Sequence, residues 1–192
     1  MRKLILIKHA SPEVNLEAPP EAWRLSPEGR AKAELLAQRL APLALAVVVT
    51  SEEVKAAETG DVLGRALSAP VERAAGLGEH DRSNVPQMPT REFISTMELV
   101  FRKPRQLVLG RETAAGALAR FRNALDDEIE SHRDKGTIAV VSHGTVIALF
   151  LAEITGKPAF EYWRRMKLPS YAVLELPSLE MTDLVEAVDG AG

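Results

Sequence analysis

The chain has 192 residues, and 46% of them are hydrophobic, which is enough for one sizeable core or at most two small ones. The formal net charge is −3, and Lys and Arg are scattered, so the composition indicates neither a nucleic-acid surface nor an anionic-membrane surface. The absence of cysteine excludes disulfides, thiolate metal sites and cysteine nucleophiles.

No apolar run approaches the roughly 18 residues of a membrane span, and the run that follows Met1 is too short for the core of a signal peptide. We therefore expect a cytoplasmic protein. The composition favours a small-molecule or protein partner, with no role for nucleic acid or membrane.

Strand-like and helix-like segments alternate along the chain. In order, the patterns predict a strand over 3–9, a helix over 26–42, a strand over 45–49, a helix to about 67, a short strand over 70–73, helices near 90–103 and 113–133, a strand ending at His143, a helix over 145–155, and strands over 172–176 and 181–188. Ser26 and Pro27 form a strong helix start, and Thr50 to Glu53 have the spacing of a capping box. The last strand is acidic enough to suggest a sheet edge.

This alternation predicts an α/β fold, a three-layer α/β/α sandwich with a mainly parallel sheet. No repeat or interdomain linker interrupts it, so we expect a single domain over 1–192, in which residues 76–109 form a loop or cap insertion. A polar surface loop is expected over 11–24. The long loop over 76–89 has a length that is usually functional in a compact domain.

Two histidines end buried strand-like runs, His9 after Leu4 to Lys8 and His143 after Ile138 to Ser142. The carboxyl ends of strands in open α/β sheets are where ligands bind. Lys55 near a helix start and Glu79 in the long loop should reach the same edge, where helix N-termini attract anions. The sequence therefore predicts a phosphate site. No carboxylates or histidines cluster at metal-ligand spacing, so we expect no metal and no cofactor.

Several motifs occur together in a recognisable order. They are Lys8-His9-Ala10 with Asn15 beyond it, Leu25-Ser26-Pro27-Glu28-Gly29, Thr50 to Thr59 with Lys55, Leu77-Gly78-Glu79-His80-Asp81-Arg82, Gly110-Arg111-Glu112-Thr113, and Val140-Val141-Ser142-His143-Gly144-Thr145. The set resembles the histidine phosphatase superfamily, also called the phosphoglycerate mutase-like family. The resemblance covers most of the chain.

The resemblance implies ping-pong phosphoryl transfer, with a phosphohistidine at His9 that water then hydrolyses. It implies His143 as a hydrogen-bond donor to the phosphoryl oxygens and Glu79, or its neighbour Asp81, as the proton donor. Lys8, Asn15, Lys55 and Gly144 would bind phosphate or substrate. His80 and His132 are not expected to be catalytic.

Both positions where the family places arginine are lysine here, Lys8 and Lys55. Arginine grips phosphate with a rigid fork, whereas lysine is a mobile point charge. Two interpretations follow: a phosphatase whose lysines, with help from Arg82 or Arg111, still hold the substrate, or a relative that binds anions without turnover.

The favoured function is a metal-independent phosphomonoesterase acting on a small phosphorylated metabolite. The alternatives are a phosphoglycerate mutase, for which 192 residues leave little room, and a non-catalytic module that binds a phosphate ligand or a protein. Residues 91–105, which include Phe93 and Met97, are expected to set specificity as a cap, although these apolar positions equally fit a core-facing helix. A homodimer is the default expectation for a small α/β enzyme.

Overall fold

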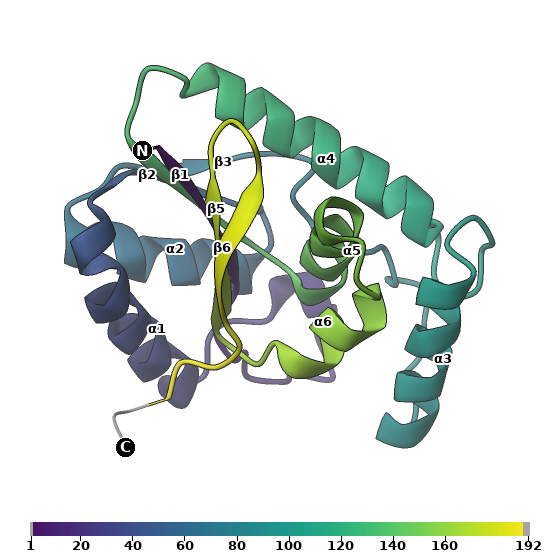
Figure 1. Ribbon diagram of the computed structural model, residues 1–192. Helices are drawn as coiled ribbons and strands as arrows, with labels where there is room; N and C mark the ends of the chain where they lie inside the picture. The colour runs from purple at the N-terminus through teal and green to yellow at the C-terminus, as the bar shows by residue number, and fades with distance from the viewer. Residues whose placement is uncertain (1, 190–192) are drawn as a thin grey trace.

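A computed structural model describes residues 2–189 and contains one mixed sheet of six strands in the order β3-β2-β4-β1-β5-β6 (Figure 1). The strands are β1 Lys3–Lys8, β2 Leu45–Thr50, β3 Val71–Arg73, β4 Thr137–Ser142, β5 Ser170–Glu175 and β6 Glu180–Val185. The first four lie parallel, and the last two are antiparallel additions. The predicted mainly parallel sheet is confirmed, and the acidic β6 is an edge strand as expected.

Helices cover both faces of this sheet. They are α1 Pro27–Leu40, α2 Val54–Leu67, α3 Thr90–Arg102, α4 Ala114–Ser131, α5 Gly144–Thr155 and α6 Ala159–Arg165, with short 3₁₀ turns at Pro20–Ala22 and Ala41–Leu43. Alternate residues of β1 point to opposite faces, so Leu4 and Leu6 pack with α4 and α5, whereas Ile5 and Ile7 pack with α1 and α2. This gives the predicted three-layer α/β/α sandwich.

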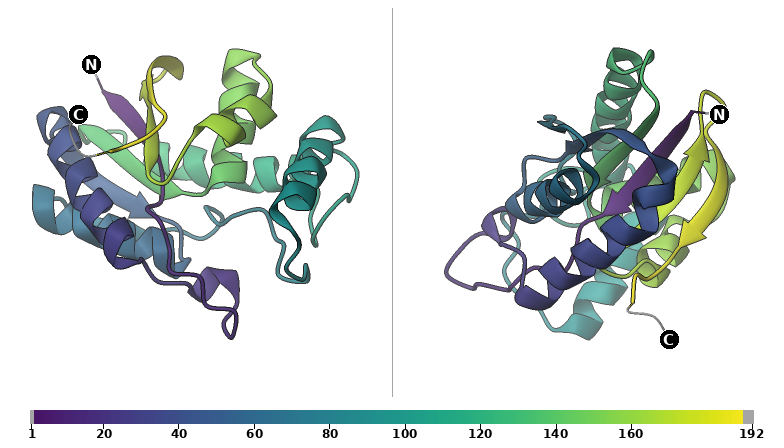
Figure 2. Two further views of the ribbon diagram at one scale, coloured as in Figure 1. Left: turned by 90° about the horizontal axis from the view of Figure 1, so that it is seen from below. Right: turned by 90° about the vertical axis from the view of Figure 1, so that its left-hand side faces the viewer.

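Helix α3 stands at the end of the molecule farthest from α1 (Figures 1 and 2). Its Phe93 lies 5.9 Å from the ring of Trp163 in α6, and Phe101 lies 6.2 Å from both Phe160 and Trp163. These contacts attach α3 to α6. Helix α6 has no counterpart among the elements that the sequence predicts, because a helix of seven residues has too few turns for a clear periodic pattern.

The start of α2 differs from the predicted capping box. The helix begins at Val54, and Glu53 in the cap position makes no side-chain capping bond. The Ser51 hydroxyl instead accepts a hydrogen bond from the Glu53 amide at 3.2 Å and contacts His143 at 2.9 Å. The polar side chains that would cap this helix are therefore committed to the site at the sheet edge.

The start of α1 agrees with the prediction. The Ser26 hydroxyl accepts from the Gly29 amide at 2.9 Å, and the Ser26 amide donates to the Ser11 carbonyl at 3.0 Å. This docks the segment after His9 against α1. A side chain at Gly29 would place its Cβ 2.0 Å from the Ser11 carbonyl oxygen, so only glycine permits this contact.

None of the helices over residues 2–189 combines the length and the apolar character needed to cross a bilayer.

We predict that Gly29→Ala destabilises the fold by about 1–3 kcal/mol, because backbone must shift to relieve the clash with Ser11. Urea denaturation measures the change. Gly136→Ala is the control, since its added Cβ would meet nothing closer than Ala46 at 3.6 Å. Equal stability of the two variants would contradict the proposed close approach.

Candidate active site

The two histidines lie together at the carboxyl ends of neighbouring strands. Lys8 of β1 pairs with Ser142 of β4, and the His9 amide donates to the Ser142 carbonyl at 3.0 Å. The imidazole rings of His9 and His143 therefore meet edge to face, 5.1 Å between centroids. The convergence predicted from the two strand ends is present.

His9 is oriented by its own backbone. Its Nδ1 lies 2.7 Å from the Ala10 carbonyl oxygen, and the Ala10 amide donates to the Thr59 hydroxyl at 3.1 Å. A carbonyl can only accept, so Nδ1 carries the proton and Nε2 keeps its lone pair. Burial is the main cause that holds the pKa of His9 well below its ordinary value, and the nearby His143 lowers it further. The ring is therefore neutral at neutral pH. The ring is thus a competent nucleophile.

His143 is fully buried behind His9. Its Nε2 lies 2.9 Å from the Ser51 hydroxyl, while its Nδ1 is buried with no hydrogen-bond partner anywhere in residues 2–189. Burial lowers the pKa of His143 to about 3, despite the opposing charge of Glu79. Nε2 also lies 3.4 Å from a Glu53 carboxylate oxygen, which favours a proton on Nε2, whereas donation from Nδ1 to a ligand oxygen requires the tautomer in which the Ser51 hydroxyl donates to Nε2.

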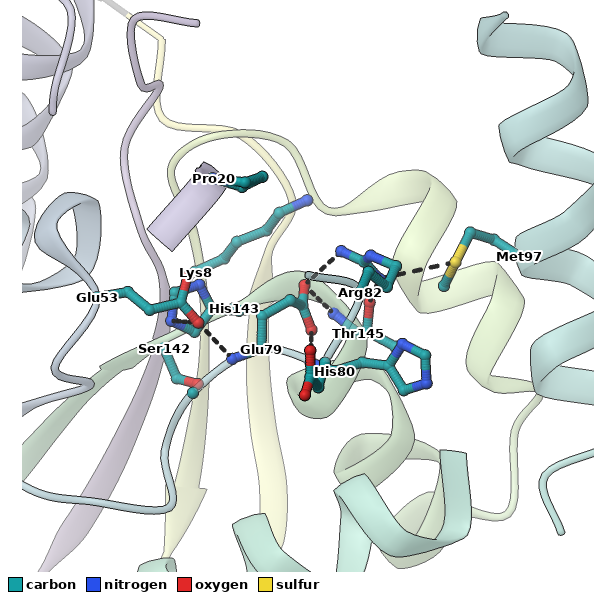
Figure 3. Close-up of polar contacts among 12 residues, drawn as sticks. Lys8, Pro20, Glu53, Glu79, His80, Arg82, Met97, Ser142, His143 and Thr145 are labelled. Atoms are coloured by element: carbon teal, nitrogen blue, oxygen red, sulfur yellow. Dashed lines mark hydrogen bonds and ion pairs between the residues drawn. The ribbon is translucent and has the colours of Figure 1, made fainter. Parts of the chain in front are cut away.

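Glu79 is held at the centre of the site by several donors (Figure 3). It accepts from the amides of His80 at 2.8 Å and Thr145 at 3.1 Å, and it lies 3.6 Å from the Arg82 guanidinium. Burial alone would raise the pKa of Glu79, but Arg82 and these amides lower it to about 2. The carboxylate is therefore ionised at neutral pH. Asp81, the competing candidate, is instead largely exposed and caps Ser83.

Lys8 lies along the floor of the site. Its Nζ donates to the Met166 carbonyl at 2.8 Å, and a Cβ on Gly144 would come within 2.9 Å of the Lys8 Cε. Gly144 therefore leaves the space that the lysine occupies at the start of α5. Burial lowers the pKa of Lys8 to about 8, with Glu79 opposing and Lys167 adding to the shift.

A cleft of about 700 Å³ opens beside these groups. Lys8, His9, Glu79 and Gly144 line it, with Phe93, Ile94 and Trp163 forming one wall and Arg164 and Lys167 adding positive charge. A nucleophile, an acid and several cations at one cleft suit the binding and cleavage of a phosphate ester.

Two predicted phosphate ligands lie elsewhere. Lys55 is buried against Glu53 and the Pro20 carbonyl and does not line the cleft. Asn15 is exposed, and its side chain closes a local turn by accepting from the Glu17 amide at 2.9 Å. Their roles as phosphate ligands stay predictions.

The two arginines suggested as substitutes for the lysines differ in position. Arg82 reaches the site, where its guanidinium contacts Glu79 and donates to the Thr145 hydroxyl at 3.1 Å. Arg111 is exposed and lies outside the cleft lining.

Sequence reasoning missed three residues that build the site. Ser51 contacts His143, Glu53 contacts both Lys55 and the Glu79 amide, and Arg120 of α4 donates to the carbonyls of Gly76, Gly78 and Glu79. Each is an ordinary polar residue in its local pattern. Only the tertiary structure brings it to the acid-bearing loop or to the histidines.

Residues 4–182 match the model of the histidine phosphatase superfamily (branch 1). No curated protein gave a significant sequence match.

Solved structures share the fold along the whole chain. A mycobacterial glucosyl-3-phosphoglycerate phosphatase is 19% identical with a TM-score of 0.76, covering 97% of this chain and 99% of its own. The phosphoserine phosphatase of Entamoeba histolytica is 18% identical with a TM-score of 0.77, covering 97% and 98%. The α-ribazole phosphatase of Shigella flexneri is 18% identical with a TM-score of 0.74, covering 99% of both chains. At these identities the matches establish the fold.

We predict that phosphate affinity falls as the pH rises through about 8, because Lys8 then loses its proton. Loss of one charged hydrogen bond should weaken binding by about 10- to 30-fold between pH 7 and 9.5, because about 3% of a group with a pKa of about 8 is still protonated at the upper pH. Calorimetric titration with inorganic phosphate measures this.

The control is Lys8→Arg, which stays charged over the whole range and should bind with little pH dependence. Lys167→Met removes a like charge beside Lys8 and should move the midpoint to higher pH. The same decline in wild type and Lys8→Arg would show that another group is responsible.

Proposed function

Because the chain belongs to the histidine phosphatase superfamily, we propose that it is a metal-independent phosphomonoesterase that hydrolyses a small phosphorylated metabolite through a phosphohistidine on His9. One observation carries the proposal. The His9 ring is neutral, is fixed through Nδ1 and lines the cleft, and it lies 5.1 Å from the ring of His143, whose Nδ1 has no partner within residues 2–189.

In the first step, His9 Nε2 forms a bond to phosphorus while the ester P–O bond breaks. Arg82 and the amide donors keep Glu79 ionised, but a bound phosphate ester brings negative charge next to it and raises its pKa. Glu79 can then carry the proton of the monoanionic ester to the departing alkoxide. The carboxylate ends this step ionised again.

In the second step, water attacks the phosphohistidine. Glu79 takes the proton from the water as the new P–O bond forms and the P–N bond breaks, which returns His9 to its neutral state. Once the phosphate has left, Glu79 releases this proton to solvent, because its pKa is again about 2. His143 Nδ1 and Lys8 would stabilise the negative charge on the phosphoryl oxygens in both steps. These groups, with the N-terminus of α5, supply the positive potential that a metal ion provides in other phosphatases.

The role of lysine as the phosphate cation is part of this proposal. Lys8 takes the position where the family places arginine, and its Nζ is fixed by the Met166 carbonyl rather than by a planar fork. The charge is therefore held by one contact on a flexible stem. Within residues 2–189, side chains spaced to hold a metal occur together only at Glu72, Glu128 and His132, none of which lines the cleft.

The phosphoenzyme is the direct test. Incubation with a chromogenic phosphomonoester followed by rapid denaturation should leave phosphate on the protein that is labile in acid and stable in base. His9→Ala should lose both the label and turnover while keeping the circular dichroism spectrum of the wild type.

The other outcomes identify the alternatives. Phosphate exchange between phosphoglycerates without net release would favour a mutase. The absence of both turnover and a phosphoenzyme across a broad panel of esters would rule out the phosphatase. That result would favour a phosphate-binding module.

The substrate-selecting surface is proposed to be the wall formed by α3 and α6. Phe93 and Ile94 of α3 line the cleft, with Trp163 of α6 beside them. Met97, predicted as part of the same cap, is fully buried among Val100, Ala114 and Leu149, and so fits the core-facing alternative.

We predict that Phe93→Ala changes the ratio of kcat/KM between aromatic and small alkyl phosphates by about tenfold, because it removes apolar contact area without touching the histidines. Steady-state kinetics on both esters measure the ratio. The control is Leu99→Ala on the same helix, where the side chain is exposed and outside the cleft lining. An unchanged ratio for Phe93→Ala would exclude this wall as the selecting surface.

A further inference from the structure

Glu53 is a carboxylate placed among the reactive groups without an assigned role. It precedes α2, and its side chain is only 17% exposed. Figure 3 shows it pointing toward the Glu79 backbone and His143. A buried carboxylate is costly unless its charge is paired, so its partners indicate what it does.

One oxygen of Glu53 is bound to Lys55. The Lys55 Nζ lies 2.5 Å from Glu53 Oε2 and donates to the Pro20 carbonyl at 2.8 Å. The lysine side chain is 9% exposed and does not line the cleft. The second cation expected to bind phosphate is therefore already neutralised by an anion of the protein itself.

Lys55 is nevertheless close to the reacting groups. Its charge contributes to lowering the pKa of both His9 and His143. Its Nζ is bound to the Glu53 carboxylate, whose other oxygen lies 3.4 Å from His143 Nε2, and the ring of His143 lies 5.1 Å from the ring of His9. Rotation of the flexible lysine stem can exchange one anion for another. The position is therefore one from which the ammonium group could reach a phosphate bound at His9.

The other oxygen of Glu53 contacts the acid-bearing loop. Oε1 accepts from the Glu79 amide at 2.7 Å and lies 3.4 Å from His143 Nε2. The same carboxylate thus holds the backbone that carries Glu79 and also restrains Lys55. Its two functions can be separated, because an amide oxygen would keep the first contact without the charge needed for the second.

We propose that Glu53 is a positioning residue that acts as an internal anion, competing with the substrate phosphate for Lys55 while it fixes the loop that carries Glu79. The proposal rests on the phosphoryl chemistry proposed above. Binding of phosphate must then release Lys55 from Glu53, so this ion pair lowers the affinity of the site for phosphate.

The test is calorimetric titration of inorganic phosphate into the wild type and Glu53→Gln. Removing the charge frees Lys55, so the dissociation constant should fall by about tenfold, the effect of one additional charged contact. The matched control is Glu52→Gln, which removes the same charge from the adjacent exposed residue and should change affinity little.

Lys55 must carry the gain. In a Lys55→Met background, Glu53→Gln should no longer tighten phosphate binding. In turnover of a chromogenic ester, Glu53→Gln should lower KM with little change in kcat, whereas Glu53→Ala also removes the acceptor of the Glu79 amide and should lower kcat. A merely structural residue would not produce this separation of KM from kcat.

Three results would overturn the proposal. Glu53→Gln could bind phosphate no more tightly than the wild type, it could still tighten binding in the Lys55→Met background, or neither the wild type nor Glu53→Gln could bind phosphate. If Glu53→Gln does not fold, Lys55→Arg provides a second test, since a guanidinium has enough donors to keep Glu53 and still face phosphate, and should tighten binding. Failure of the proposed phosphatase is distinguishable, because it appears as absent turnover and not in the phosphate titration.

Discussion

The parallel pairing of β1 with β4 is the constraint on which the site depends. Lys8 and Ser142 are the last paired residues of these two strands, so His9 and His143 both lie one residue beyond the ladder. The amide of His9 donates to the Ser142 carbonyl and so extends the pairing. A slip of one residue would turn one imidazole to the other face of the sheet. The proposed chemistry therefore depends on the register of two strands whose apolar side chains are buried on both faces of the sheet.

The loop that carries Glu79 has no such ladder and is held by side chains instead. Arg120 binds three of its carbonyls from α4, the Ser142 hydroxyl donates to the Leu77 carbonyl at 2.6 Å, and Glu53 accepts from the Glu79 amide. The buried backbone groups of this irregular segment are thus satisfied by residues from α4, β4 and the start of α2. A catalytic carboxylate on a loop becomes well positioned only through contacts of this kind.

This difference explains what the sequence could predict. The strands, the sandwich and the meeting of His9 with His143 follow from apolar runs and from the geometry of parallel sheets, and the structure confirms them. Ser51 and Glu53 could cap a helix or contact His143 and Lys55, and the structure shows the second. The choice depends on residues distant in the sequence, which the local spacing does not reveal. The short helix α6 was missed for a related reason, since its aromatic residues are ordered by α3 rather than by their own periodicity.

Because α3 is attached to α6 through aromatic rings, substitutions that alter the cleft wall can be separated from substitutions that alter the proposed reacting groups. The proposed reacting groups belong to the ends of β1 and β4 and to the loop that carries Glu79. Phe93 and Trp163 instead belong to helices that contact each other at the wall of the cleft. Substitutions in this aromatic contact can widen or narrow the opening while the strand register stays intact. A scaffold built in this way can acquire new substrates without rebuilding its chemistry, which makes the α3–α6 contact the natural place to redesign its selectivity.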